Sequence, residues 1–291
     1  MTIKNGRQNE ILLTIPSFVW LILFFVIPSL IILGYAFKPE EPYGGVGNGW
    51  TLHTLQSVFE SGYFVLILRT LILSALTTLL CLLLALPVGY QLTQTPPKMR
   101  RLLLLLLVIP FWSSFLIRIF AWKTLLHPEG IFKQTLVALH LVSPETTLLY
   151  NSPAVLLVMV YTYLPFAVFP IYAAASKFNF QLIEAALDLG ASRTQAFFKV
   201  FVPGINKGIF TAMMMVFIPA IGAYVIPDLV GGSNSEMIGN KIAQRTFYDR
   251  NLPQASALSV LLGLIVILPM AAITLWSWRF KKIEAEARNR E

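Results

Sequence analysis

Four charged side chains lie inside long apolar runs of this sequence: Arg69, Arg118, Lys123 and Asp228. A charge in hydrocarbon costs several kcal/mol unless it is paired or faces water, so each is a candidate for function. Arg69 and Lys123 lie near the ends of their runs, where a long side chain reaches the membrane surface. Arg118 and Asp228 have opposite signs. We expect either an ion pair between them or a role for Asp228 in receiving a cation.

Aromatic side chains in the same runs would offer their faces to an ammonium group through cation–π contacts. Ordinary packing, or a position in the aromatic belt of a membrane interface, is the alternative for each of them. The aromatic candidates are Trp112, Tyr161, Tyr163, Phe166 and Tyr224. The predicted solute path consists of Asp228, Tyr224, Trp112, Ser113, Arg118, Tyr161 and Phe166.

The sequence lacks the residue patterns of an enzyme that works alone. Its single cysteine, Cys81, excludes an intrachain disulfide and a cysteine metal cluster. The three histidines have no paired spacing, and we interpret them as solvated loop residues: His53, His127 and His140. No G-x-x-x-x-G-K-[ST] phosphate loop occurs, so any ATP and Mg²⁺ would be bound by a partner ATPase. We expect no metal, no bound cofactor and no nucleic-acid partner.

The composition indicates an all-α integral membrane protein. Of the 291 residues, 56% are hydrophobic and 12% are charged, whereas charged residues make up about a quarter of a soluble domain. A helix crosses the hydrocarbon with about 20 apolar residues, and the in/out alternation of a membrane barrel is absent. We predict one transmembrane domain over residues 1–291, with helices at 11–37, 63–92, 102–126, 153–175, 208–230 and 255–278.

The distribution of basic residues predicts the orientation, because cytoplasmic segments carry an excess of lysine and arginine. Segments 1–10, 93–101, 176–207 and 279–291 hold 14 of these residues, against five in 38–62, 127–152 and 231–254. We therefore expect both termini in the cytoplasm and a cell-membrane location. In the second outer loop, apolar residues recur at helical spacing between Ile131 and Leu141, which predicts a short amphipathic helix.

The longest inner loop, 176–207, carries the most specific pattern in the chain. Apolar residues on one side of two short segments predict two short helices joined at Gly190, which can adopt the left-handed conformation that ends a helix. Pro203 is expected to stop the second helix. The alternative for such an amphipathic loop is a resting place at lipid headgroups. The pattern begins with Glu184, Ala185, Ala186, Leu187, Asp188, Leu189, Gly190, Ala191 and Ser192, and ends with Val200, Phe201, Val202 and Pro203.

This pattern resembles the signature loop of the permease subunits of binding-protein-dependent ABC importers. E-A-A is followed by three residues, Gly and nine further residues; two aliphatic residues separated by one residue come next, and Pro ends the pattern. The likeness extends over nearly the whole chain and is greatest to the spermidine and putrescine permease subunits, through residues 110–118, 184–192 and 218–240. Some polyamine permeases carry an acid where Ala223 stands, which leaves other solutes of the family open.

The resemblance implies the type I importer permease fold, with six transmembrane helices and a cytoplasmic loop, here called the coupling loop (residues 176–207). It implies a second permease subunit, two cytoplasmic ATPases and an extracytoplasmic substrate-binding protein as partners, with membrane lipid around them. ATP binding by the ATPases would drive alternating access. The residues implied to contact an ATPase are Glu184, Ala185, Ala186, Leu187, Asp188, Gly190, Ala191 and Ser192.

Two other classes of protein fit parts of the sequence. A channel or secondary transporter is compatible with six spans and charges within them, but it gives no reason for the E-A-A pattern. A membrane enzyme would need a cluster of polar groups at one depth, which the sequence does not contain. Within the importer family, amino acids, sugars and iron remain alternative solutes to a polyamine.

Overall fold

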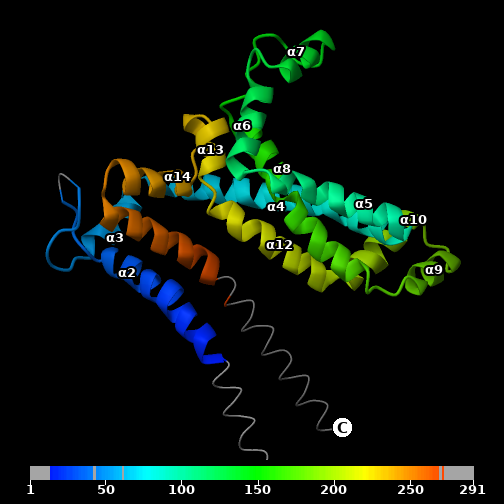
Figure 1. Cartoon of the computed structure of the whole chain (residues 1–291), viewed down its shortest axis with the longest axis horizontal. Helices are drawn as coiled ribbons and strands as arrows, with labels where there is room; N and C mark the ends of the chain where they lie inside the picture. The colour runs from blue at the N-terminus through cyan, green and yellow to red at the C-terminus, as the bar shows by residue number, and fades with distance from the viewer. Residues whose placement is uncertain (1–13, 42–43, 61, 269–270, 272–291) are drawn as a thin grey trace, which may run out of the picture. The chain divides into compact units, whose positions relative to one another are not determined.

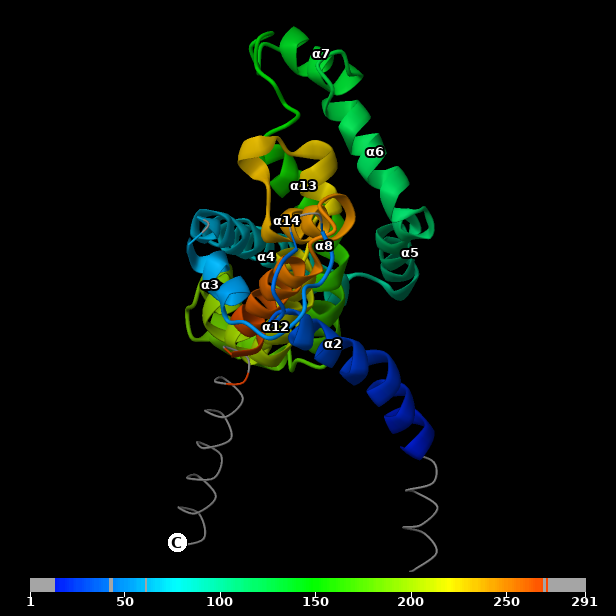
Figure 2. The ribbon, with the colours of Figure 1, turned by 90° about the vertical axis from the view of Figure 1, so that its left-hand side faces the viewer.

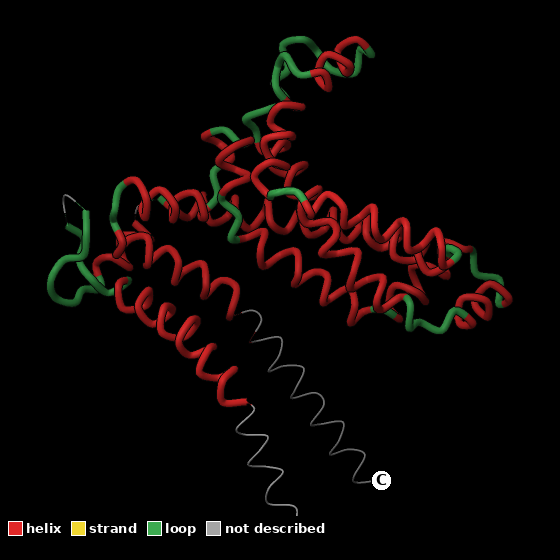
Figure 3. Tube along the Cα trace, viewed as in Figure 1, coloured by secondary structure: helices red, strands yellow, loops and turns green. Residues whose placement is uncertain are grey.

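The computed structural model describes the chain except for residues 1–13, 42–43, 61, 269–270 and 272–291 (Figure 1). The described residues form helices and loops without a strand (Figure 3), which confirms the all-α prediction. Three helices are long and apolar enough to cross a membrane, and the number rises to five if each of two sharply bent pairs is one span. Both termini, the start of the first predicted span (residues 11–13) and most of the last ten residues of the sixth (269–270 and 272–278) lie outside the described residues.

The helices form two compact units, each considered by itself. The first unit combines residues up to Phe64 with those from Lys241 onward. Asn251 Nδ2 donates to Glu40 Oε2 across 2.9 Å and so joins its two stretches of chain. The helices of this unit are the stretch Thr14–Tyr35 with η1 (Ile22–Val26) and α2 (Ile27–Tyr35), then α3 (His53–Glu60), η5 (Gln244–Tyr248) and Leu252–Leu268.

Arg245 is the charged residue of this unit with the most polar contacts. Its guanidinium forms a 2.8 Å salt bridge with Asp249 and donates to the Tyr63 hydroxyl across 3.1 Å. Burial disfavours the charged form, but the hydrogen bond to Tyr63 and the Asp249 carboxylate outweigh this effect and raise the pKa of Arg245 above its usual value.

The second unit, Val65–Asn240, is built around α8 (Ser152–Ala175), which packs most extensively against α12 (Asn206–Ile221). Its core side chains are apolar and fully buried, as expected for a helix covered on several sides. Close packing depends on Gly208 of α12, where a Cβ would lie 2.3 Å from the Cβ of Ala174. The buried members include Val155, Val158, Met159, Val168 and Ile171.

The long helix α4 (Tyr63–Gln94) packs beside α8 with a similar close approach. A Cβ on Gly89 would lie 2.6 Å from Ile171 Cγ2, so this position has room only for glycine. Pro87 lies inside α4, and two prolines, Pro165 and Pro170, lie inside α8, yet both helices continue through them. A proline in these spans is therefore not sufficient to break a helix.

The third predicted span, 102–126, is interrupted in the structure. The helix α5 (Pro97–Val108) continues as η2 (Ile109–Trp112), stops at two serines, and restarts as α6 (Phe115–Leu126) at an angle of 93°. Proline at the start of η2 and the extended backbone of Ser113 account for the interruption. Figure 2 shows α5 and α6 pointing in clearly different directions.

The amphipathic helix predicted in the second outer loop is confirmed as α7 (Ile131–Ala138). It lies at the far end of the arm that α6 begins, away from α4, α8 and α12 (Figures 1 and 2). Lys133 is almost fully buried, and its ammonium is satisfied by donating to the Pro144 carbonyl across 2.8 Å. A charged residue therefore fastens this helix to the loop that follows it.

The fifth predicted span is also interrupted. Helix α12 ends at Ile221, residues 222–224 are not helical, and α13 (Val225–Val230) follows. We call residues 222–224 the helix break. The remaining elements of the second unit are α9 (Gln181–Asp188), α10 (Arg193–Ala196), η3 (Phe197–Phe201), α11 (Val202–Gly204), η4 (Ser233–Ser235) and the start of α14 (Ile238–Ala243).

Candidate functional site

The coupling loop contains the two short helices that the sequence predicts, joined by a complete helix-ending motif. Gly190 has φ +87°, the left-handed conformation that glycine adopts without strain. The Ala191 N–H donates to the Ala186 carbonyl across 3.0 Å, and the Gly190 N–H donates to Leu187 across 2.9 Å. These are the two bonds of a Schellman motif, and they satisfy carbonyl groups that the end of α9 would otherwise leave free.

The second short helix begins with a capping box one residue later. The Gln195 N–H donates to Ser192 Oγ across 3.2 Å, and the Ser192 N–H donates to Gln195 Oε1 across 2.9 Å. Both bonds join residues three apart, so the corner between α9 and α10 is held by its own sequence. The helical run then passes through Pro203 and ends at Gly204, so Pro203 does not stop it as predicted. The next helix starts at an angle of 75°.

Five rings connect the coupling loop to the end of α4 and are here called the aromatic cluster. Tyr90 of α4 has ring-centroid distances of 4.9 Å to Phe201 and 5.4 Å to Phe197, both edge to face. Edge-to-face pairs stabilise a packed arrangement beyond the burial of their area. The members are Tyr90, Phe178, Phe180, Phe197 and Phe201.

One glycine makes this arrangement possible. A Cβ on Gly204 would lie 2.3 Å from Phe178 Cε2, so a larger residue would displace that ring. Phe201 is fully buried in the cluster. The coupling loop is therefore packed rigidly against α4 rather than lying loosely beside it.

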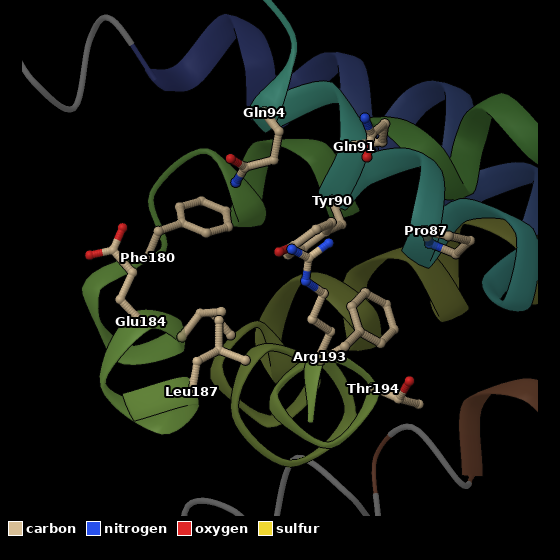
Figure 4. Close-up of a pocket in the computed structure, with 11 residues that line it drawn as sticks. Pro87, Tyr90, Gln91, Gln94, Phe180, Glu184, Leu187, Arg193 and Thr194 are labelled. Atoms are coloured by element: carbon tan, nitrogen blue, oxygen red, sulfur yellow. The ribbon is translucent and has the colours of Figure 1, made fainter. Parts of the chain in front are cut away.

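A pocket of about 620 Å³ lies beside the cluster, between the end of α4 and the two short helices. Figure 4 shows Arg193 pointing toward Tyr90, while the Glu184 carboxylate points away from it. Glu184 is exposed. The salt bridge found among the described residues joins Arg245 to Asp249, so the Glu184 carboxylate is free to meet a partner. The lining residues are Pro87, Tyr90, Gln91, Gln94, Phe180, Ile183, Glu184, Leu187, Arg193, Thr194 and Phe197.

The coupling loop exposes apolar side chains from the apolar faces of its two short helices. Leu182 is 52% exposed and Phe198 is 59% exposed, so only part of each predicted face packs inward. Leu189, beside the glycine corner, is 89% exposed. Exposed leucine and phenylalanine on a rigid corner form a surface suited to a protein partner.

The ion pair between Arg118 and Asp228, which was one of two alternatives, is not among the salt bridges of the described residues. Arg118 Nη1 donates to the Pro110 carbonyl across 2.8 Å, and its guanidinium lies 4.4 Å from the centroid of the Phe111 ring. The Ser113 N–H also donates to this carbonyl across 3.4 Å at the end of η2, and a cation at a helix C-terminus is favourable. Arg118 thus holds the α5–α6 corner, and Ser113 Oγ donates to the same carbonyl across 2.7 Å.

The other aromatic residues predicted for the solute path between α5 and α8 either pack against another ring or are exposed. Trp112 is 79% exposed. Tyr161 packs edge to face against Trp122 with centroids 5.3 Å apart, and Phe166 packs against Phe111 at 6.0 Å. These contacts are ordinary packing, which was the alternative for each aromatic residue.

Tyr224 and Asp228 lie together at the helix break. Both are exposed, and they are four residues apart at the start of α13, where residues share a face. The Asp228 N–H donates to the Tyr224 carbonyl across 3.0 Å and begins the helix. Tyr163, by contrast, is buried, and its hydroxyl donates to the Pro219 carbonyl across 3.3 Å. Tyr163 therefore has a structural role.

Sequence reasoning missed the residues that act through contacts between distant segments. Tyr90 was not distinguished from other aromatics, although a ring at the inner end of a span beside a phenylalanine-rich loop is a usable signal. Thr70 gave no signal in a single sequence, and Asn240 was marked only as part of the stretch 218–240 that carries the family likeness. Their partners lie 168 and 16 residues away.

Comparison with known proteins agrees with this geometry. Residues 82–280 match the family of the binding-protein-dependent transport system inner membrane component. The chain belongs to this family. It is a multi-pass membrane protein and a transport permease, and the matched residues include the coupling loop. The family is one of transport permeases and not of ATPases.

Relatives extend the match over nearly the whole chain. The spermidine/putrescine transport system permease protein PotB of Salmonella typhimurium (strain LT2) is 34% identical over 276 residues, which cover 95% of this chain and 94% of the relative. The PotB protein of Escherichia coli (strain K12) is 34% identical over 272 residues, or 92% and 98% of the two chains. The inner membrane ABC transporter permease protein YdcU of Escherichia coli is 28% identical, covering 77% and 75%.

Solved structures share the fold. A chain of a bacterial ABC transporter involved in the import of the acidic polysaccharide alginate superposes with a TM-score of 0.71 at 19% identity, covering 95% of this chain and 98% of that chain. A chain of a bacterial alginate ABC transporter in complex with an alginate pentasaccharide-bound periplasmic protein also gives a TM-score of 0.71 at 19% identity, covering 97% of this chain and 98% of that chain. The importer permease fold is therefore confirmed for this chain.

Proposed function

We propose that this chain is the permease subunit of an ABC importer for polyamines such as spermidine and putrescine. Family membership gives the importer permease, and the names of relatives that are 34% identical over at least 92% of the chain support the polyamine. The observation that carries the proposal is the capped, rigid coupling loop with its exposed apolar corner, inside a chain with that likeness. The whole complex would contain a second permease subunit, two cytoplasmic ATPases and an extracytoplasmic binding protein.

The coupling loop is the docking surface for one ATPase in this proposal. Glu184 and the exposed leucines around Gly190 would enter a cleft of the ATPase, and the local hydrogen bonds would keep the loop in one shape as it moves. Tyr90 would then transmit the movement to α4 through its ring contacts with Phe197 and Phe201. ATP binding shifts the complex between inward-open and outward-open states because the ATPases bind ATP with different affinity in each state.

Tyr224 and Asp228 are the residues proposed to meet the solute. A carboxylate and an aromatic face on one side of α13 match the two groups that recognise an ammonium. Non-helical backbone at membrane depth is tolerated where it is buried in protein or lines a water-filled cavity. The helix break, which includes Tyr224, fits that condition. Arg118 does not compete for Asp228, since its guanidinium is engaged at Pro110.

The proposal is tested with the reconstituted complex. The chain is expressed with its candidate partners, purified through a tag on this chain, and assayed for a co-purifying ATPase and for uptake of labelled spermidine. Asp228→Asn is expected to raise the KM for spermidine about three- to tenfold with normal assembly, because a partly screened carboxylate–ammonium pair contributes on the order of 1 kcal/mol. The matched control is Glu145→Gln, which removes another exposed acid.

Three results would count against parts of this proposal. Purification without any ATPase would favour a channel or secondary transporter. ATP hydrolysis stimulated by an amino acid, a sugar or iron, without spermidine uptake, would overturn the polyamine and keep the importer. An equal KM increase in Asp228→Asn and Glu145→Gln would remove Asp228 from the solute path.

A further inference from the structure

The helix break leaves backbone groups that must be satisfied by something other than a helix. Because α12 ends at Ile221, its last carbonyls have no N–H four residues further on. The Tyr163 hydroxyl supplies a donor to the Pro219 carbonyl, and the Ala223 N–H donates to Ala220 across 3.2 Å. The far side of the break, at Tyr224, has no side-chain cap of its own.

Residues 237–240, here called the outer turn, supply what the far side lacks. Asn240 Nδ2 donates to the Tyr224 carbonyl across 2.9 Å. The Oδ1 of the same amide accepts the Met237 N–H across 3.1 Å. One side chain therefore fastens the outer turn to itself and to the residue that begins α13.

The outer turn is also fastened to α4. The Ile238 N–H donates to Thr70 Oγ1 across 2.8 Å, and both residues are buried. Thr70 Oγ1 in turn donates to the Leu66 carbonyl across 2.8 Å, so the hydroxyl has one fixed donor and one fixed acceptor. The helix break is thus connected through Asn240 and Ile238 to the long helix.

Gly239 brings the outer turn into direct contact with the backbone of the break. A Cβ at this position would lie 2.6 Å from the Ala223 carbonyl oxygen and 3.1 Å from Tyr224 Cβ. No real Cβ approaches a backbone oxygen that closely, so any larger residue would push the two segments apart. The glycine is needed here for space, not for an unusual backbone angle.

We propose that the outer turn is a positioning element, in which Asn240 and Gly239 hold the helix break in shape and thereby orient Tyr224 and Asp228. Neither residue contacts the solute in this assignment. The inference rests on the proposed function for the identity of the solute, but its geometric part does not. It assigns a role to the stretch Met-Ile-Gly-Asn, which the coupling mechanism leaves unexplained.

The first test is Asn240→Asp in the assembled complex. Aspartate keeps the shape and the acceptor for Met237 N–H but has no N–H to give to Tyr224. The KM for labelled spermidine is expected to rise about five- to tenfold, as for loss of one of the two hydrogen bonds that the Tyr224 carbonyl accepts, with assembly and maximal ATP hydrolysis retained. Amide hydrogen exchange in 225–230 is expected to quicken about as much. Asn234→Asp makes the same charge change at an exposed residue of the same loop and should alter neither readout.

The second test replaces glycine by alanine at two positions of the contact. Gly239→Ala places its Cβ against the Ala223 oxygen and should raise the KM and exchange in 225–230. Gly222→Ala is the matched control: its nearest neighbour would be the Pro219 oxygen at 4.0 Å, so both readouts should stay within about twofold of the unmodified complex.

Particular outcomes overturn the assignment. Unchanged KM and unchanged exchange in Asn240→Asp would show that its bond to Tyr224 does not hold the break. Loss of assembly in Asn240→Asp, with Asn234→Asp intact, would make Asn240 a plain stability residue. If the unmodified complex moves no polyamine, the proposed substrate fails, and the exchange measurements alone decide the positioning role.

Discussion

The coupling loop and the helix break are both places where a helix of the second unit ends, but they are held in different ways. At the coupling loop, the bonds that close the corner join residues three to five positions apart. At the helix break, the satisfying side chains come from 16 and 56 residues away, and the outer turn is fastened across 168. The first corner is local in the sequence, and the second is built from three separate segments.

This difference matches the roles proposed for the two regions. A corner closed by its own Schellman motif and capping box keeps its shape wherever the rest of the chain moves, as a docking surface requires. A break held by α4, α8 and the outer turn changes whenever those elements shift relative to one another. The helix break is therefore suited to respond to movement, and the coupling loop is suited to transmit it.

Labelling from outside the cell gives the largest contrast between the loop and the arm that carries α7. Cysteines would be introduced singly at Asn206 and Ser143, both exposed, against a background in which Cys81 is buried. An impermeant thiol reagent added to intact cells is expected to label Ser143→Cys and not Asn206→Cys, because the basic residues around the coupling loop favour the cytoplasm. Labelling of Asn206→Cys and not of Ser143→Cys would show that the orientation is the opposite one and that the coupling loop does not face the cytoplasmic ATPases.

A substitution at Gly190 tests whether the coupling loop depends on its own backbone. Valine at φ +87° costs roughly 1–2 kcal/mol or more in the left-handed region, although no neighbouring atom lies within 4 Å of the added Cβ. Gly190→Val is expected to lower uptake more than tenfold with normal membrane insertion. Gly190→Asn, which tolerates this conformation, should retain most activity. Normal solute-stimulated ATP hydrolysis by Gly190→Val would contradict the role of this corner.

Two single-atom changes compare a long-range contact with a local one. Thr70→Ala leaves the buried Ile238 N–H without a partner and should cost about 1–3 kcal/mol, whereas Thr70→Ser should be nearly neutral. Ser192→Ala removes an exposed cap and should cost about 1 kcal/mol. Thermal unfolding of the purified complex measures both. A larger loss from Ser192→Ala would reverse the comparison.

The coupling loop could be predicted from sequence because its physics is local. Gly190 after a short amphipathic stretch, with Ser192 and Gln195 three apart, specifies both the end of one helix and the start of the next. The all-α membrane class follows in the same way from composition and run length.

The two interruptions, at the α5–α6 corner and at the helix break, could be only partly predicted, because proline gives an ambiguous signal. Pro87 and Pro165 lie inside continuous helices, whereas Pro110 and Pro219 precede an interruption. The Pro110 carbonyl accepts from Ser113 and Arg118, three and eight residues away, whereas the Pro219 carbonyl accepts from Tyr163, 56 residues away. The sharp corner after Trp112 and the role of Asn240 therefore needed the structure.

The expected pair between Arg118 and Asp228 shows why opposite charges at comparable predicted depths do not define a contact. That alternative placed the two charges at comparable depths in antiparallel spans. The 93° corner instead brings Arg118 back to the Pro110 carbonyl, one helix earlier in the chain.

The last and smallest expected effect is the absence of coupling between these two charges. Arg118→Gln removes a charge-assisted bond at the α5–α6 corner, but Ser113 Oγ still donates to Pro110, so stability should fall by only about 1 kcal/mol. In the double variant Arg118→Gln/Asp228→Asn, the two losses should add to within about 0.5 kcal/mol, as for residues that share no partner. A structural pair would behave differently, since removing the second charge would rescue the first loss. Rescue of uptake and stability in the double variant would show that the two residues meet in some state of the complex, and Asp228 would then belong to a helix-holding pair rather than to the solute path.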